Sequence, residues 1–355
     1  MFFELDFLPV DSGERSGDAI CMRYGEREEE QIVIVIDGGT VETGENLVEH
    51  IKNFYNTDVV DHVISTHPDS DHVSGLRKVV EELDVKNVWM HQPWNHAEEL
   101  KDKFKDTRFT TEGLAKKLRE AYSLAAELEE IAEEKGVPIS EPFQGMQVGV
   151  FLVLSPTLDW YLDLVPQFDN TPEAKTVSEG FFKKAIRAVL SWIDEEWDIE
   201  TLSETANTSP SNESSVILYA NLDDKKILLT ADSGIQALGA AADYAEDNEI
   251  DLKKGNFYQI PHHGSRNNVT PTVLNRIIGN KLPKGSQKIK IGLASVSSQS
   301  KTHPRKVVTN AFQRRGVETY KTDSEWVCYR HNIKSRENAT NMEPIEFSSQ
   351  VEASE

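Results

Sequence analysis

Residues 67–72 hold the densest group of potential metal ligands in the chain, with two imidazoles and two carboxylates within six positions. They directly follow the apolar run at 59–64, so we expect them on a short loop at the end of a strand. Imidazole nitrogens and carboxylate oxygens suit a divalent first-row metal, and two neighbouring acids suit a pair of ions better than one. The sequence therefore predicts that His67, Asp69, Asp71 and His72 bind two metal ions; the competing interpretation is a polar surface loop.

Two later segments could complete such a site. Residues 228–234 (LLTADSG) and 259–265 (QIPHHGS) are each a strand-like apolar run that ends in a possible ligand and a small residue. Asp232 could bridge two ions, and one of the adjacent His262 and His263 could complete the second coordination sphere. A single Asp-Ser-Gly is typical of a turn, but three such strand ends in one chain indicate a dinuclear centre.

The pattern HxDxDH followed by xxGL at 67–76 resembles the metallo-β-lactamase-fold hydrolases, whose common form is HxHxDH. Further similar segments are GDAI at 17–20, DGG at 37–39, LSP at 154–156, NESSV at 212–216 and THP at 302–304. Together with LLTADSG and HHGS, they resemble the extracytoplasmic hydrolase domain of ComEC-type DNA-uptake (competence) proteins and its soluble relatives, over about residues 1–330. The resemblance implies an α/β fold, the metallo-β-lactamase-like αβ/βα sandwich.

Given this resemblance, we assign His67 and Asp69 to the first metal, Asp71 and His72 to the second, and Asp232 to both. A carboxylate at position 69, in place of the usual histidine, makes the first site harder. That change shifts the expected metal from zinc towards manganese. The predicted cofactors are two divalent ions, Mn or Zn.

The last predicted ligand is one of the paired histidines. Related hydrolases carry an H-x-G-[ST] pattern whose first residue binds metal, which favours His262 as the ligand and His263 as a residue facing the substrate. The reverse assignment stays open. The common form of the family has one more histidine before the bridging acid, and only His91 and His96 lie in that interval. His91 follows a predicted strand and is either a site residue or a structural one.

Two metal ions held together would lower the pKa of a bridging water and hold a phosphoryl oxygen for in-line attack. Asp71 or Asp232 could orient that water. His303 is the candidate for a phosphate contact or for protonating the leaving oxygen, and the alternative is a histidine on a surface loop. Donors to a phosphate are expected from Ser265, Arg266, Asn267, Lys301 and Arg305.

The charge of the chain is unevenly distributed. The net charge of −22 argues against a polyanionic ligand, yet residues 252–321 contain fourteen Lys or Arg and one acid, a charge of about +13. This stretch also holds His262, His263 and His303. It could therefore form a positively charged surface beside the metal site for an anionic substrate. Alternatively, the lysines only solubilise one layer of the protein.

The composition is that of a soluble protein with a substantial core. The chain has 355 residues, of which 38% are hydrophobic, and no apolar run approaches the roughly 18 residues of a membrane span. The start of the chain lacks a basic region, so we expect no secretory signal and a cytoplasmic location. Cys21 and Cys328 are too few for a disulfide framework.

The strand and helix patterns predict one hydrolase domain over residues 1–331. Long helical patterns at about 97–135 and 158–210 indicate insertions, which either pack onto the domain or offer a surface for a protein partner or a homodimer. Residues 332–355 show no periodicity, so a disordered tail is expected there.

The residues argue for a metal-dependent hydrolase that acts on an anion. The resemblance adds phosphodiesterase or nuclease activity, with DNA or another nucleic acid as substrate and no membrane involvement. The alternatives are hydrolysis of a small phosphodiester or a lactone, and a metal-binding scaffold or sensor subunit of a protein complex.

Overall fold

Strands with alternating apolar residues build two sheets, because successive side chains of a strand point to opposite faces. In the first strand, Phe3, Leu5 and Phe7 point to one face, and all three are fully buried. They belong to the same apolar cluster as Leu218 and Leu229 of the other sheet, so this cluster fills the space between the sheets. The structure is a computed structural model and describes residues 1–11, 13–106, 108–169, 171, 191–322, 324–337 and 339–353.

The first sheet has seven strands. In spatial order they are β17 (Val327–His331), β1 (Phe2–Phe7), β2 (Ala19–Gly25), β3 (Ile32–Gly38), β5 (His62–Ile64), β7 (Val88–Trp89) and β8 (Ile139–Ser140). Pairing is antiparallel from β17 to β3 and parallel from β3 to β8. A separate parallel pair joins β4 (Val59–Val60) to β6 (Asp84–Val85).

The second sheet also has seven strands. They are β16 (Val317–Lys321), β15 (Lys290–Ala294), β14 (Phe257–Gln259), β13 (Lys225–Leu229), β12 (Ile217–Leu222), β10 (Phe151–Ser155) and β9 (Gln147–Val148). The strands from β13 to β16 are parallel, so their carboxyl ends meet at one edge of the sheet.

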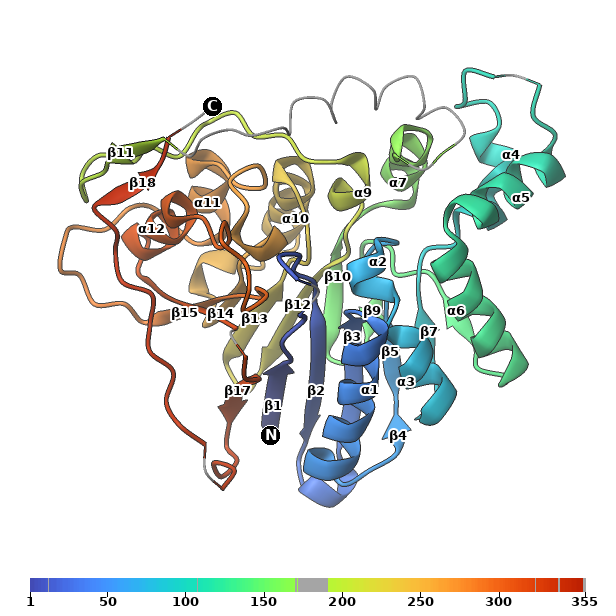
Figure 1. The fold of residues 1–355 in the computed structure, drawn as a ribbon, viewed down its shortest axis with the longest axis horizontal. Coiled ribbons are helices and arrows are strands. Elements are labelled where there is room, and N and C mark those ends of the chain that lie inside the picture. The colour runs from blue at the N-terminus through green and yellow to red at the C-terminus, as the bar shows by residue number, and fades with distance from the viewer. Residues whose placement is uncertain are drawn as a thin grey trace.

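Helices cover the outer face of each sheet (Figure 1). Helices α1 (Val41–His50), α3 (Leu76–Glu82) and α6 (Ser123–Glu134) share one apolar cluster with the outer side chains of the first sheet. Helices α10 (Ile235–Asp247), α11 (Pro271–Ile277) and α12 (Lys306–Arg314) do the same for the second. The predicted αβ/βα sandwich is therefore confirmed. No helix in the described part of the chain is long and apolar enough to cross a membrane.

The described parts of the two intervals in which insertions are predicted contain both helices and a strand. The first interval contains α4 (Ala97–Leu100), α5 (Thr111–Ala121) and α6, and its apolar residues Leu114, Leu118 and Leu128 are fully buried against the first layer. These apolar residues therefore pack within the chain. The second contains α7 (Leu158–Leu164), β11 (Trp192–Asp194) and α9 (Pro210–Glu213); the amphipathic stretch expected at 181–186 lies outside the described residues.

The disordered tail predicted from residue 332 is not observed in the described part of that segment. The chain after β17 runs along one side of the molecule and ends in β18 (Gln350–Glu352), which pairs with β11 (Figure 1). Val351 is fully buried in the core of the second layer. A single apolar residue gives no periodicity, and the partner strand lies about 160 residues earlier in the sequence, so local pattern could not reveal this strand.

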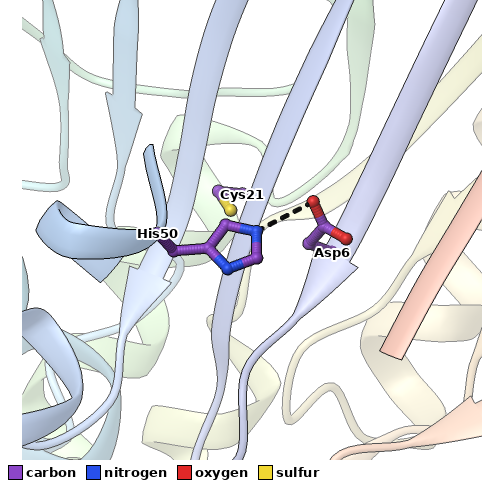
Figure 2. Close-up of side chains that lie close together, drawn as sticks. All are labelled: Asp6, Cys21 and His50. Atoms are coloured by element: carbon purple, nitrogen blue, oxygen red, sulfur yellow. Dashed lines mark hydrogen bonds and ion pairs between the residues drawn. The ribbon is translucent and has the colours of Figure 1, made fainter. Parts of the chain in front are cut away.

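A buried polar cluster attaches the same C-terminal segment to the first sheet. The Asp6 carboxylate accepts hydrogen bonds from His50 (3.1 Å), Tyr55 (2.7 Å) and Arg336 (2.7 Å). Figure 2 shows the His50 ring pointing at Asp6, with the buried Cys21 beside them. Burial opposes ionisation of Asp6, but His50 and Arg336 outweigh it and lower the pKa of Asp6 to about 2.

We expect Asp6→Asn to destabilise the protein by roughly 2 kcal/mol at pH 7. The pKa of Asp6 is lower in the folded state than its ordinary value of 3.8. The stabilisation is therefore complete above that value and is lost as the pH falls towards about 2. Urea unfolding of the wild type and Asp6→Asn at pH 7, 4 and 3 measures the difference, with the exposed Asp102→Asn as control. A difference that does not shrink at low pH would contradict the assignment.

Candidate metal centre

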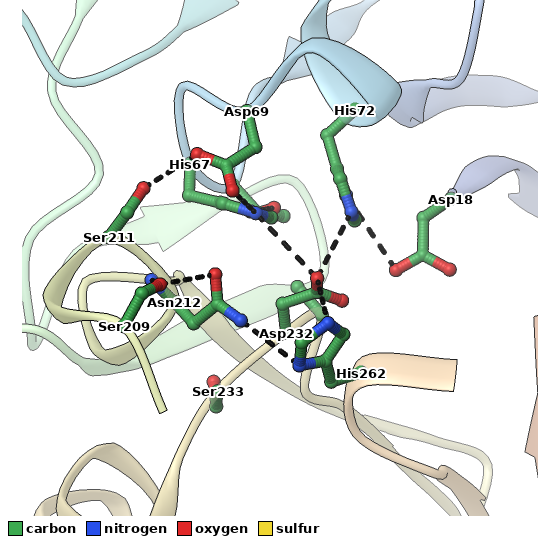
Figure 3. Close-up of polar contacts among 12 residues, drawn as sticks. Asp18, His67, Asp69, His72, Ser209, Ser211, Asn212, Asp232, Ser233 and His262 are labelled. Atoms are coloured by element: carbon green, nitrogen blue, oxygen red, sulfur yellow. Dashed lines mark hydrogen bonds and ion pairs between the residues drawn. The ribbon is translucent and has the colours of Figure 1, made fainter. Parts of the chain in front are cut away.

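The predicted ligands come together where the carboxyl ends of strands from both sheets meet. The loop after β5 carries His67 and leads into the short helix α2 (Ser70–Val73), which carries His72. The loops after β13 and β14 carry Asp232 and the His262–His263 pair. Figure 3 shows the side chains of His67, His72, Asp232 and His262 pointing toward one another.

The centre of the group is the Asp232 carboxylate. The Nε2 atoms of His72 and His262 each lie 3.5 Å from its Oδ2 atom, and that of His67 lies 3.9 Å away. The Nε2 atom of His263 lies 3.7 Å from Oδ1. Four imidazoles thus surround one carboxylate. The ligand atoms of Asp232, His262 and His263 lie close enough together to hold one cation, as do those of Asp18, His72 and Asp232.

The buried atoms at this point fit a metal ion. The Nε2 atoms of His67, His72 and His263 are inaccessible to solvent and have no hydrogen-bond partner among the described residues, and the same is true of Asp232 Oδ1 and Asp18 Oδ1. Burying polar atoms without a partner is costly, so such atoms pointing at one place need explanation. Divalent cations satisfy both imidazole nitrogens and carboxylate oxygens, and this donor set therefore fits them.

The two aspartates flank this group as the sequence predicts. Asp69 Oδ2 lies 3.7 Å from His67 Nε2, and its Oδ1 atom accepts a hydrogen bond from Ser211 (2.7 Å). Asp71, His72 and His263 form another group whose ligand atoms lie close enough to hold one ion. These contacts place Asp69 beside His67, and Asp71 beside His72 and His263.

A second carboxylate orients the first pair of histidines. His72 donates from Nδ1 to Asp37 Oδ2 (2.8 Å), which leaves its Nε2 atom directed at Asp232. Asp37 also accepts from the Thr66 hydroxyl (2.6 Å), and that hydroxyl lies 3.0 Å from His67 Nδ1. Such outer partners fix the tautomer and ring orientation of metal-binding histidines.

The paired histidines are oriented by a sharp turn of the backbone. His262 and His263 both have positive φ (46° and 57°), which is rare for residues other than glycine, and this conformation directs adjacent rings at the same carboxylate. His263 is buried and donates from Nδ1 to the Ser295 carbonyl (2.8 Å). His262 is partly exposed, and its Nδ1 atom lies 2.9 Å from Asn268 Oδ1.

The charges of the centre reinforce one another. Burial raises the pKa of Asp232. The histidines His262, His263 and His72 outweigh burial and hold that pKa well below its ordinary value. Burial disfavours the charged form of His72, yet the carboxylates of Asp232 and Asp37 raise its pKa well above the ordinary value. In the metal-free protein, a proton on His72 therefore lies where a cation would bind. Metal binding would release that proton.

His303 lies near the centre and is neutral at neutral pH. Burial, followed by repulsion from His263, His262 and Arg305, lowers the pKa of His303 to about 3. Its Nδ1 atom lies 3.1 Å from the Thr302 hydroxyl. A neutral imidazole can donate or accept a hydrogen bond, which suits the predicted phosphate contact better than the predicted proton donation.

The predicted phosphate donors are placed differently from one another. Arg305 has a buried Nη1 atom without a hydrogen-bond partner and lies close enough to His303 to affect its charge. Lys301 is exposed and pairs with Glu14 (2.5 Å), and Arg266 donates to backbone carbonyls of the C-terminal segment. Ser265 accepts from the Asn267 backbone (3.3 Å). Among these five residues, Arg305 has the clearest unused donor.

The two histidines between the motifs lie outside the metal-binding groups found among the described residues. His91 is buried between the rings of Phe143 and Tyr161, with centroid distances of 4.7 and 4.3 Å. His96 pairs with Glu141 at 2.6 Å. His96 is therefore held by Glu141, whereas both ring nitrogens of His91 are buried without a hydrogen-bond partner among the described residues.

Sequence analysis did not identify Asp18 and Asp37 as site residues. Asp18 Oδ2 lies 3.8 Å from His72 Nδ1 and accepts from Gln259 (2.7 Å). Both aspartates lie in segments noted above for family similarity, GDAI and DGG, but no role was given to their side chains. The available signal was their position, since Asp18 directly precedes β2 and Asp37 is the penultimate residue of β3.

We expect Asp37→Asn to weaken metal binding by roughly 10- to 100-fold, because the amide loses the charge that holds His72 in its ligand tautomer. Titration of the metal-free protein with Mn²⁺ or Zn²⁺ against a chelator measures this loss. Asp61→Asn is the matched control, because Asp61 also lies in the first layer but bonds the Val33 backbone, away from the site. Unchanged metal affinity in Asp37→Asn would remove Asp37 from the site.

The comparisons with known proteins agree with this fold. Residues 27–154 match the family model of the Metallo-beta-lactamase superfamily, a range that contains the His67–His72 motif but ends before Asp232. None of the curated protein sequences matches the chain.

Among solved structures, the chain is similar to a metal-dependent hydrolase of the β-lactamase superfamily, with 11% identity and a TM-score of 0.43, over 94% of this chain and 100% of the other. A putative metallo-β-lactamase from Thermotoga maritima has 9% identity and a TM-score of 0.32, over 65% of this chain and 79% of the other. A metallo-β-lactamase from Hirschia baltica has 9% identity and a TM-score of 0.30, over 70% and 81%.

Proposed function

We propose that this chain, which has the metallo-β-lactamase fold, is a metal-dependent hydrolase that cleaves phosphodiesters with two divalent ions. The observation that carries the proposal is the convergence of four imidazole Nε2 atoms on the Asp232 carboxylate. Three of these atoms are buried without a partner, which is the arrangement expected of ligands rather than of a structural polar cluster. The match of residues 27–154 to the superfamily model supports hydrolysis as the reaction class.

The proposal divides the ligands between two ions. Asp71, His72 and His263, whose ligand atoms lie close together, would hold one ion. His67 and Asp69, whose nearest ligand atoms lie 3.7 Å apart, would hold the other together with His262, whose Nε2 atom lies 3.5 Å from Asp232 Oδ2. In this arrangement His262 takes the place of the family histidine that the chain lacks, and Asp232 serves both ions.

Divalent ions bound here would supply Lewis acidity, which lowers the pKa of a water molecule and polarises an ester. The chain's own residues do the positioning. Asp37 holds the His72 ring, and the Ser295 carbonyl holds that of His263. Neutral His303 and the free Nη1 atom of Arg305 could bind a phosphoryl oxygen beside the centre.

A small phosphodiester is the second candidate substrate, because part of the charge of the basic stretch is paired within the protein. Arg314 and Arg315 are buried and bonded to Glu195 and Glu200, and Lys301 pairs with Glu14. Three of the fourteen positive charges at 252–321 are thereby paired. Nucleic acid as the substrate rests on the sequence resemblance, and the residues themselves support a phosphodiester of either size.

The test is hydrolysis by metal-free protein reconstituted with Mn²⁺ or Zn²⁺, on bis-p-nitrophenyl phosphate and on single- and double-stranded DNA. Activity on DNA supports a nuclease, and activity on the small ester alone supports the second candidate. Protein that binds two ions but hydrolyses none of these substrates would favour a metal-binding scaffold or sensor. Asp71→Asn, which removes one carboxylate charge from the centre, controls for contaminating phosphodiesterase.

A further inference from the structure

The last described residues of the chain contact both loops that carry the late histidines. Residues 345–353 run along the second layer, where the Ile345 backbone donates to the Thr319 carbonyl (2.7 Å) and Ser348 pairs with Asn310. The segment ends in β18, next to β11 and near α12 in Figure 1. Earlier in the chain, Arg336 donates to the Asp6 carboxylate of the first sheet. The segment is therefore anchored at both ends.

Glu352 provides the cap of helix α12. Its side chain is buried, with Oε1 3.2 Å from the Lys306 amide and Oε2 3.3 Å from the Val307 amide. The residue before the helix, Arg305, makes no side-chain capping bond, so the first amides of α12 would otherwise lack acceptors. A carboxylate at a helix N-terminus also interacts favourably with the helix dipole. Glu352 therefore sets where α12 begins.

The start of α12 is in turn locked against the turn that carries His262 and His263. The Arg305 amide donates to the Gly264 carbonyl (3.0 Å). Gly264 packs so closely on Pro304 that a Cβ atom at this position would lie 2.5 Å from the Pro304 Cβ atom. Any shift of the helix start would therefore move the histidine turn and His303 together.

A second contact joins the same segment to the residues just after the turn. The Arg266 guanidinium donates to the backbone carbonyls of Glu352 (3.2 Å) and Ala353. Two residues at the end of the chain thus hold the loop after His263 and the helix after His303.

We infer that Glu352 is a positioning residue of the metal centre, acting through the start of α12 and the Gly264 turn on His262 and His263. The inference rests on the proposed metal site. It extends that site to a segment about 90 residues further along the sequence, which reaches the site through Arg266, Lys306 and Val307.

The test compares Glu352→Ala and Glu352→Gln with the exposed control Glu346→Ala. Metal-free proteins are titrated with Zn²⁺ and with Mn²⁺ against a chelator, at a temperature where circular dichroism shows each to be folded. We expect Glu352→Ala to bind metal roughly 10-fold more weakly, Glu352→Gln to fall between it and the wild type because the amide oxygen still accepts one bond, and Glu346→Ala to match the wild type. Glu352→Gln keeps the test valid if the alanine variant does not fold.

The outcomes separate this inference from the proposed function. Wild-type protein that binds metal, together with glutamine and alanine variants that bind it equally well, would overturn the positioning role alone. A lower unfolding temperature of the metal-free variants with unchanged metal affinity would likewise show that Glu352 is only structural. Wild-type protein that binds no metal would overturn the metal centre, and the positioning role with it.

Discussion

Asp232→Asn is expected to lower phosphodiester hydrolysis by on the order of 10³-fold or more, because Asp232 is the one residue that all four histidines approach. The amide has the same size, so the fold should persist, but it carries no charge to hold two cations. Metal analysis should show fewer than two ions per chain, and turnover at saturating metal should remain low. The measurement is turnover together with metal content on the same preparation.

The control for Asp232→Asn is Asp243→Asn, an exposed acid on helix α10 that pairs only with Arg276 at the surface. It changes the net charge equally and should leave metal content and turnover unchanged. Wild-type turnover by Asp232→Asn at full metal content would place the reaction elsewhere in the molecule.

The His262→Ala and His263→Ala variants are expected to lose about one metal ion each and to retain hydrolysis at no more than roughly 1% of wild type. Sequence reasoning favoured His262 as the ligand and left His263 as its alternative. The structure brings both Nε2 atoms to Asp232, one at each oxygen, so each ring can serve a different ion. The buried His263 should hold its ion more tightly than the partly exposed His262.

Metal content measured by mass spectrometry, as a function of free metal, decides between these assignments. If His263→Ala retains both ions and loses only turnover, His263 is the substrate contact that the sequence pattern suggested. If His262→Ala behaves in that way, the roles are exchanged. His331→Ala, a change far from the site at the end of β17, is the matched control.

The sequence was sufficient for the fold where local pattern and local structure coincide. The helical pattern at about 97–135 predicted a helical segment, and the structure has α4, α5 and α6 there. The metal motif could be located because its ligands lie within six residues at one strand end. Asp232 and the paired histidines could be added because parallel strands bring their carboxyl ends to the same edge.

What the sequence could not provide depends on contacts between distant segments. Asp37 orients His72 across 35 positions, and nothing in the DGG segment indicates which imidazole its carboxylate will meet. Glu352 caps a helix 46 residues earlier. The basic stretch suggested a positive surface for an anion. The acids that pair with Arg314 and Arg315 are Glu195 and Glu200, which lie outside this stretch in the second predicted insertion. Charge counts along a chain do not reveal such pairing.

The pairing of β1 with β17 also has a consequence for how the protein folds. Phe3 lies opposite His331, so the outer strand of the first sheet is added only after residue 331 has been synthesised. Until then, β1 presents an open edge of unpaired amides and carbonyls on a strand whose side chains, apart from those of Glu4 and Asp6, are apolar. Contacts of such large sequence separation form slowly, because a long loop must close first. The nascent chain is therefore most prone to aggregation in the interval before residue 331 emerges, and truncation within β17 should yield insoluble protein even though every metal ligand is present.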